Sequence, residues 1–273
     1  MSNLLLESVR EVWNRPRLWW FMAIYGLMAL FTTSGLDYFF SPTFVHYLFM
    51  YAEMQSATFL RLIAGTMFAF SLAVKPILSI YLTSALVRFY EVPQSTVRSA
   101  IWRAILQPGL LLFALLGSAY GYYQLFSWMG VESVLREAFS LRWTGMYLAV
   151  IAFAFVVPFI IYQLFMLFVP VAVWRVTNPL EMLKRNLQTI WRELSELVVS
   201  GGAYFLFILV VSFGLRIGLY KLAIGLGEIK QMPIAVQAIA VAAMGYLSFC
   251  VFLLIPMTAW VIFLVKVYNR AHQ

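Results

Sequence analysis

The chain has 273 residues, of which 63% are hydrophobic and only 11% are charged. A soluble domain carries roughly 25% charged residues, so this composition excludes an ordinary water-facing globule and predicts a protein embedded in lipid. The net charge is +8, but no basic run is interleaved with stacking aromatic residues, which excludes nucleic acid as a partner.

Charged residues divide the chain into six apolar stretches, each close to the roughly 20 residues that cross a bilayer. The first stretch lacks a cleavage signature and is interpreted as a retained span. Twelve Lys and Arg residues fall on the side of the N-terminus and six on the other, which predicts both chain ends in the cytoplasm. The predicted spans are 18–35, the stretch between Arg61 and Arg88, 108–128, 146–174, 197–215 and 234–265.

The second, fourth and sixth spans contain Pro76, Pro158 and Pro256. Proline removes a backbone donor and kinks a helix, so these three spans are expected to bend. Simple helix curvature is the alternative explanation.

A segment with the pattern of an amphipathic helix precedes each odd-numbered span. A tripled hairpin would produce this threefold organisation, and so would convergent helices at three elbows of the chain. The sequence therefore predicts an all-α integral membrane protein, a single polytopic domain over 1–273, with six transmembrane helices arranged as three hairpins. The three predicted interfacial segments are 3–13, 96–106 and 179–194, and each has a base followed by a Trp: Arg10 and Trp13, Arg98 and Trp102, Arg185 and Trp191.

In the third segment, leucines, Ile190 and Trp191 recur at helical spacing on one face, and charged residues fill the other. Asn178 is expected to cap the helix, Pro179 suits its first turn, and Glu181 stands where a capping side chain reaches back. Such a helix lies at a membrane interface, with its bases toward anionic headgroups. The expected lipid contacts are Lys184, Arg185 and Arg192, followed by Arg98 and Arg103 of the second segment.

Catalytic residue types are scarce. Asp37 is the one aspartate, Cys250 the one cysteine, and the two histidines, His46 and His272, fall on opposite sides of the predicted membrane. These residues support neither an aspartyl pair, nor a Ser–His pair, nor a metal centre. The sequence predicts no catalytic site, no metal and no cofactor.

Lys75 stands near the middle of the second span, where a charge is costly and marks a functional candidate. Its partner would be an anionic ligand, an acid on another subunit, or carbonyls freed at a proline kink. The alternative is a lysine neutralised by burial or reaching water in a shallow cavity.

Two Gly-x-x-x-Gly patterns, Gly117 with Gly121 and Gly214 with Gly218, predict close helix packing. Packing within one chain is favoured here over dimerisation.

The run from Asn178 to Arg185, followed by an apolar span that contains Gly201 and Gly202, resembles a loose group of bacterial six-span membrane proteins. These are similar to the membrane domain fused to some glycerophosphodiester phosphodiesterases. The group shows a Pro-x-Glu-Ala-x-x-Arg-Ser-like interfacial helix, from which this chain departs at Met182 and Asn186. The resemblance implies a fold and a place in the bacterial cytoplasmic membrane, but no activity, because the phosphodiesterase chemistry belongs to a separate soluble domain.

The function expected from these patterns is that of a non-enzymatic membrane scaffold or accessory subunit, which binds anionic lipid and a partner protein, or a second copy of itself, at the cytoplasmic face. The alternative is a transporter or lipid-handling permease with a midplane site for an anionic substrate near Lys75. An enzyme acting on lipid is a third reading, which the missing catalytic groups oppose.

Overall fold

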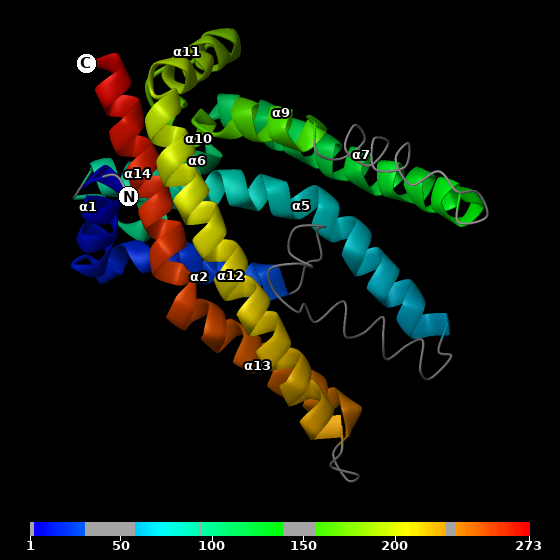
Figure 1. Cartoon of the computed structure of the whole chain (residues 1–273). Coiled ribbons are helices and arrows are strands. Elements are labelled where there is room, and N and C mark those ends of the chain that lie inside the picture. Colours follow the sequence, from blue (N-terminus) through cyan, green and yellow to red (C-terminus); the bar gives the residue numbers. More distant parts are fainter. Residues whose placement is uncertain (1–2, 31–57, 93, 139–156, 228–232) are drawn as a thin grey trace.

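The computed structural model describes residues 3–30, 58–92, 94–138, 157–227 and 233–273. This part of the chain is helical and contains no strand, which confirms the predicted all-α class. The elements, shown in Figure 1, are α1 (Asn3–Trp13), η1 (Pro16–Leu18), α2 (Trp19–Leu30), α5 (Thr58–Glu91), α6 (Val97–Ile105), α7 (Pro108–Ala138), α9 (Val157–Met166), α10 (Val169–Ala172), α11 (Pro179–Arg192), α12 (Leu194–Gly227), α13 (Ile234–Phe252) and α14 (Leu254–His272).

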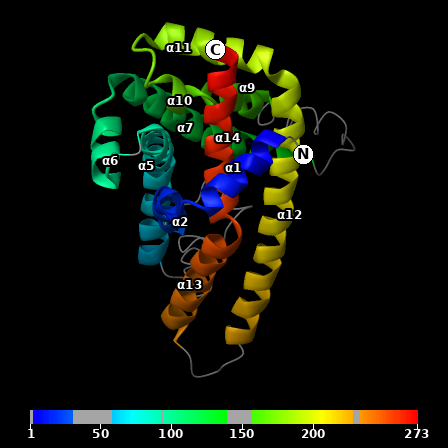
Figure 2. The same cartoon turned by 90° about the vertical axis from the view of Figure 1, so that its left-hand side faces the viewer.

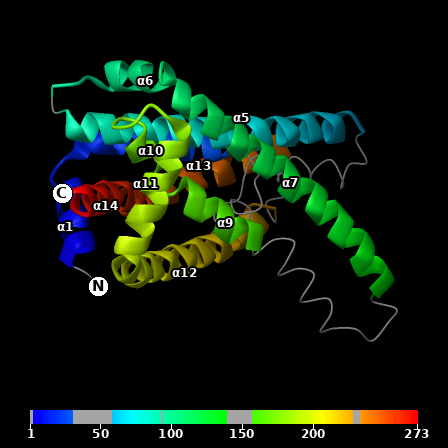
Figure 3. The same ribbon diagram turned by 90° about the horizontal axis from the view of Figure 1, so that it is seen from above.

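Three short amphipathic helices, α1, α6 and α11, coincide with the three segments predicted from the sequence. We call them the elbow helices, because each stands directly before an apolar helix and turns the chain into it. The elbow α6 meets α7 at 76°, and α11 lies crosswise to both α12 and α14 (Figures 2 and 3). The threefold order of elbow helix and apolar helix is therefore confirmed in the described residues.

Local caps explain where two elbow helices begin. Thr96 and Ser99 cap α6 reciprocally, since the Ser99 N–H donates to Thr96 Oγ1 (3.2 Å) and the Thr96 N–H to Ser99 Oγ (3.0 Å). At α11, Asn178 Oδ1 accepts from the backbone N–H of Leu180 (3.0 Å), as expected. The capping role predicted for Glu181 was wrong, because its carboxylate accepts hydrogen bonds from the side chain of Arg185, one turn further on.

The chemistry of proline explains one helix break that was not predicted. α5 runs through Pro76 as one helix and bends along its course (Figure 1). The break in the fourth predicted span separates Met166 from Val169, and it precedes Pro170, which has no N–H to donate to the Met166 carbonyl. Pro158 is the second described residue of α9, and the residues before Val157 lie outside the described ones, so the kink at Pro158 stays a prediction.

The predicted kink at Pro256 is confirmed. The segments Ile239–Phe252 and Leu254–His272 meet at 47°. Pro256 cannot donate to the carbonyl of Phe252, whereas the N–H of Leu253 still donates to Phe249 O at 2.9 Å, so the helix breaks where the donor is missing.

One described helix is long and apolar enough to cross a membrane, the segment Leu194–Leu226 of α12. Two bent pairs, α6 with α7 and α13 with α14, meet the same criterion when each is counted as one span, which gives up to three. At 1.5 Å per residue, the 34 residues of α12 extend about 51 Å, longer than a hydrocarbon core of roughly 30 Å.

The hydrophobic core lies at the end of the molecule that carries the elbow helices and both chain ends (Figure 1). Its centre is α14, surrounded by α1, α2, α5, α10 and α11 (Figure 2). Ile262, Phe263 and Tyr268 of α14 are fully buried, and the Tyr268 ring packs 5.9 Å from that of Phe168. Away from this end, α12 leaves most of its apolar side chains exposed.

Candidate functional site

Each elbow helix presents a tryptophan that the protein does not cover. Trp13 is 64% exposed, Trp102 55% and Trp191 80%. Large apolar side chains accompany them on the same faces: Leu6 on α1, Ile105 and Leu106 beside α6, and Leu180 and Leu187 on α11. Repeated three times in one chain, an exposed tryptophan with aliphatic neighbours is typical of a surface that meets lipid.

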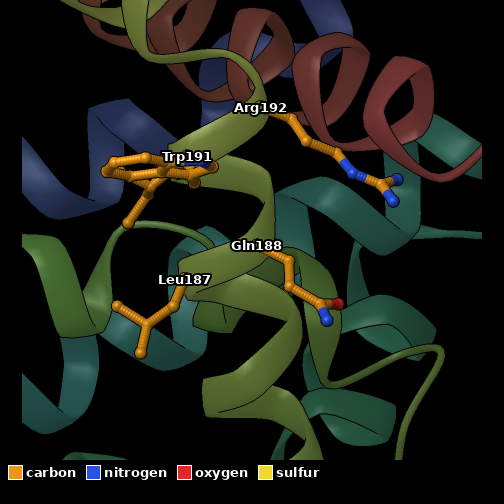
Figure 4. A pocket seen from close by; sticks show the side chains of 5 residues that line it. Leu187, Gln188, Trp191 and Arg192 are labelled. Atoms are coloured by element: carbon orange, nitrogen blue, oxygen red, sulfur yellow. The ribbon is translucent and has the colours of Figure 1, made fainter.

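The faces of α11 are clearest. Met182, Asn186 and Thr189 are buried against the protein. Leu187 and Trp191 project together from a second face, and Gln188 and Arg192 project to the other side (Figure 4). A shallow, open hollow of about 420 Å³ is lined by Leu187, Gln188, Ile190, Trp191 and Arg192. The helix therefore has one face for the protein, one that is apolar and uncovered, and one that is polar.

The other elbow helices are divided in the same way. Ala100 and Ala104 of α6 are buried, Trp102 is exposed, and Arg98 stands one helical turn before it. On α1, Leu5 and Val12 face the core, while Leu6, Trp13 and the base Arg10 are exposed. A small buried residue or aliphatic side chain lets each helix approach the protein without covering its tryptophan.

The residues predicted to contact lipid differ in whether they form ion pairs or hydrogen bonds within the protein. Lys184, Arg98 and Arg103 are exposed and make no ion pair within the described part of the chain. Arg185 is held by Glu181 on its own helix, with Nε at 3.1 Å and a terminal nitrogen at 2.8 Å from the carboxylate, and this hydrogen bond raises its pKa. Arg192 donates to the carbonyl oxygen of Ala271 at 2.6 Å.

A cluster around Glu11, which sequence reasoning missed, fastens α1 to α5 and α14. The Glu11 carboxylate lies 3.2 Å from Lys266 Nζ and 3.3 Å from Arg15, and it accepts a hydrogen bond from the Tyr90 hydroxyl at 3.1 Å. Burial, and then the adjacent Glu11 charge, raise the pKa of Tyr90 to about 12, so the phenol remains a donor. Tyr90 and Lys266 are 79 and 255 residues away from Glu11 in sequence, and local pattern gives no signal for such contacts.

A second fastening centres on Arg175, directly after α10. Its guanidinium pairs with Glu91 at the end of α5, donates to Asn269 Oδ1 at 2.5 Å, and lies 4.9 Å from the centre of the Tyr268 ring. It also donates to the carbonyl oxygen of Val171 at 3.1 Å. One arginine thus joins α5, α10 and α14.

Polar contacts hold the C-terminal end of α14 against α11 and the beginning of α12. Arg270 pairs with Glu193. Thr189 Oγ1 donates to the Arg185 carbonyl (2.8 Å), so it accepts from His272 Nε2 at 3.0 Å. Burial, followed by the charges of Arg185, Arg192 and Arg175, lowers the pKa of His272, which favours the neutral ring.

Several predicted sites fall outside what the structure describes. The backbone of Lys75 lies in α5, but its side chain is not among the described ones. Asp37 and His46 also lie outside the described residues. Among those that are described, no group of three or more His, Cys, Asp or Glu side chains is arranged to hold a metal ion.

The two glycine patterns differ in their surroundings. Gly117 is buried and Gly121 half-buried on α7, which packs along α5. A Cβ added at Gly214 or Gly218 would meet nothing within 4 Å. Close packing within the chain, expected for both patterns, is therefore absent at the second one among the described residues.

No protein family, curated protein or solved structure matches the chain. The similarity of the segment around α11 to phosphodiesterase-linked membrane domains stays a prediction.

Proposed function

We propose that the protein is a non-enzymatic membrane scaffold or accessory subunit, which anchors in anionic lipid through its three elbow helices and binds a partner at the same end. In this proposal six spans form three hairpins in a bacterial cytoplasmic membrane, and both chain ends lie in the cytoplasm. The observation that carries it is the exposed tryptophan found on all three elbow helices beside exposed aliphatic side chains.

The side chains on these faces favour contact with lipid over contact with water. An exposed tryptophan is favoured where its ring meets acyl chains while its N–H meets headgroups. Each basic side chain near an anionic surface contributes on the order of 1 kcal/mol, so the free cations Arg98, Arg103 and Lys184 favour anionic lipid. The bases engaged within the protein, Arg185 and Arg192, are expected to contribute less.

The elbow end is also the well-packed end of the molecule. Ion pairs and hydrogen bonds around Glu11, Arg175 and Arg270 join its helices, so this end would hold the elbow faces in a fixed arrangement. A fixed, charged surface is the property a scaffold needs to orient a partner.

Lipid dependence is tested by incorporating the full chain into nanodiscs of phosphatidylcholine with or without phosphatidylglycerol. Native mass spectrometry then counts the lipids that stay bound after release from the disc. The double variant Arg98→Gln, Arg103→Gln removes two exposed charges from α6. The matched control Arg61→Gln, Lys221→Gln removes two exposed charges from the far ends of α5 and α12 (Figure 1).

We expect the α6 variant to retain clearly less phosphatidylglycerol than wild type, and the control variant to retain as much. Equal retention by both variants, or no preference of the wild type for phosphatidylglycerol, would contradict lipid anchoring by the elbow helices. Purification of the same two double variants also tests partner binding. We expect a protein that co-purifies with the wild type to co-purify with the control variant.

A further inference from the structure

Arg88, in the last turn of α5, has no acidic partner within the described part of the chain. Its neighbour Glu91 is engaged by Arg175. The side chain is half-buried, and its Nε is sealed from solvent without a hydrogen-bond partner. Its two terminal nitrogens are neither bonded to a described group nor buried. The terminal nitrogens of this guanidinium are therefore not sealed from solvent, whereas its Nε is.

The ring of Trp174 lies against this guanidinium. The Arg88 guanidinium carbon lies 5.3 Å from the centre of the Trp174 ring, within the range of a cation–π contact. Trp174 is itself held in place, because its indole N–H donates to the carbonyl oxygen of Ser84 at 3.0 Å, one turn before Arg88 on α5. The ring and the guanidinium form a preorganised pair between α5 and the link from α10 to α11.

The place of this pair suggests what it binds. Arg88 ends the apolar run of α5, at the end of the molecule that carries the elbow helices (Figure 1). If the elbow helices lie at the membrane interface, as proposed above, the free guanidinium reaches the level of the headgroups. Its planar fork matches the geometry of a phosphate group, which accepts two parallel hydrogen bonds.

We propose that Arg88, held against Trp174, binds the phosphate of a lipid headgroup. Because the guanidinium is already immobilised, binding loses little side-chain entropy. This site is separate from the elbow faces, where Arg98, Arg103 and Lys184 are exposed and stack on no ring within the described part of the chain. The inference rests on the proposed membrane anchoring.

The test is a titration of the purified full chain, in a neutral detergent, with dihexanoyl phosphatidylglycerol, followed by native mass spectrometry. The variant Arg88→Gln removes the charge, and Arg88→Lys keeps the charge but loses the planar fork. The control Arg61→Gln removes one exposed arginine from the far end of the same helix, α5. Melting temperatures of all variants are compared, so that a folding defect is recognised, and Arg88→Lys carries the test if Arg88→Gln does not fold.

Loss of charge-assisted hydrogen bonds predicts at least roughly tenfold weaker binding of the tightest lipid for Arg88→Gln. A smaller loss of about threefold is expected for Arg88→Lys, and less for Arg61→Gln. Affinity of a folded Arg88→Gln protein within twofold of wild type would overturn the proposal, as would an unchanged Arg88→Lys if only that variant folds.

Competition with inorganic phosphate distinguishes the sources of the anion. Displacement of the lipid by millimolar phosphate would mean that the site takes free phosphate and would overturn the assignment to a lipid. Persistence of the lipid supports it. An unchanged Arg88→Gln together with a weakened α6 double variant would remove this inference alone, whereas loss of the phosphatidylglycerol preference in the wild type would remove the proposed function.

Discussion

The carboxylate of Glu11 is expected to contribute measurably to stability, because three groups from three parts of the chain converge on it. In Glu11→Gln, Lys266 keeps one acidic partner among the described residues, Glu7 at 3.9 Å, and Arg15 loses its i,i+4 partner. Hydrogen bonds to charged groups contribute roughly 1.5–3 kcal/mol, and exposed pairs about 0–1 kcal/mol. The Glu11 side chain is 23% exposed, so we expect a loss of about 2 kcal/mol in total.

The assay is thermal unfolding of the detergent-solubilised protein, in which a change of 2 kcal/mol lowers Tm by roughly 4–8 °C for a chain of this size. Glu7→Gln is the matched control. Its side chain is 67% exposed, and its substitution is expected to change stability by less than about 0.5 kcal/mol. The same small Tm change in both variants would refute the view that Glu11 joins α1 to α5 and α14.

Three further outcomes are expected. His272 has a lowered pKa in the folded chain, so its contribution to stability is present above its unfolded pKa of about 6.5 and is lost as the pH falls below that value; wild-type Tm should therefore drop more than that of His272→Gln between pH 7.5 and 5.5. Gly26→Ala should cost about 1–3 kcal/mol, because the new Cβ would lie 2.2 Å from a ring carbon of buried Phe249; unchanged thermal unfolding would show that the ring moves aside. Gly218→Ala meets open space and should stabilise α12 by up to about 1 kcal/mol; a destabilised variant would instead indicate a neighbour packed against that glycine.

The short-range features of this fold were predictable. Three elbow helices follow from the spacing of apolar residues, and the beginning of α11 follows from Asn178 and Pro179, because both signals act within one helical turn. The kink at Pro256 follows from its missing N–H, whereas the break ahead of Pro170 was not predicted, although the same missing donor explains it.

The long-range features were not predictable from pattern. Which face of α11 meets the protein depends on Met182, Asn186 and Thr189, and Asn186 and Thr189 are polar residues that a hydrophobicity pattern assigns to solvent. Asn186 Nδ2 donates to the carbonyl oxygen of Leu164 (2.9 Å), and that hydrogen bond offsets the cost of its burial. The stacking of Arg88 on Trp174 likewise depends on α5 meeting the link between α10 and α11, which neither segment encodes alone.

The environment of the three faces of α11 in a bilayer tests most directly whether the elbow helices anchor the protein in lipid. Nitroxide labels are attached to single cysteines at positions 182, 187 and 188, in a Cys250→Ser background and in phosphatidylglycerol-containing vesicles, and power-saturation electron paramagnetic resonance measures collisions with oxygen and with a water-soluble nickel complex. We predict that the label replacing Leu187 collides with oxygen, the label replacing Gln188 with nickel, and the label replacing Met182 with neither. Equal nickel accessibility at 187 and 188 would show that the face carrying Trp191 meets water, and would contradict anchoring by the elbow helices.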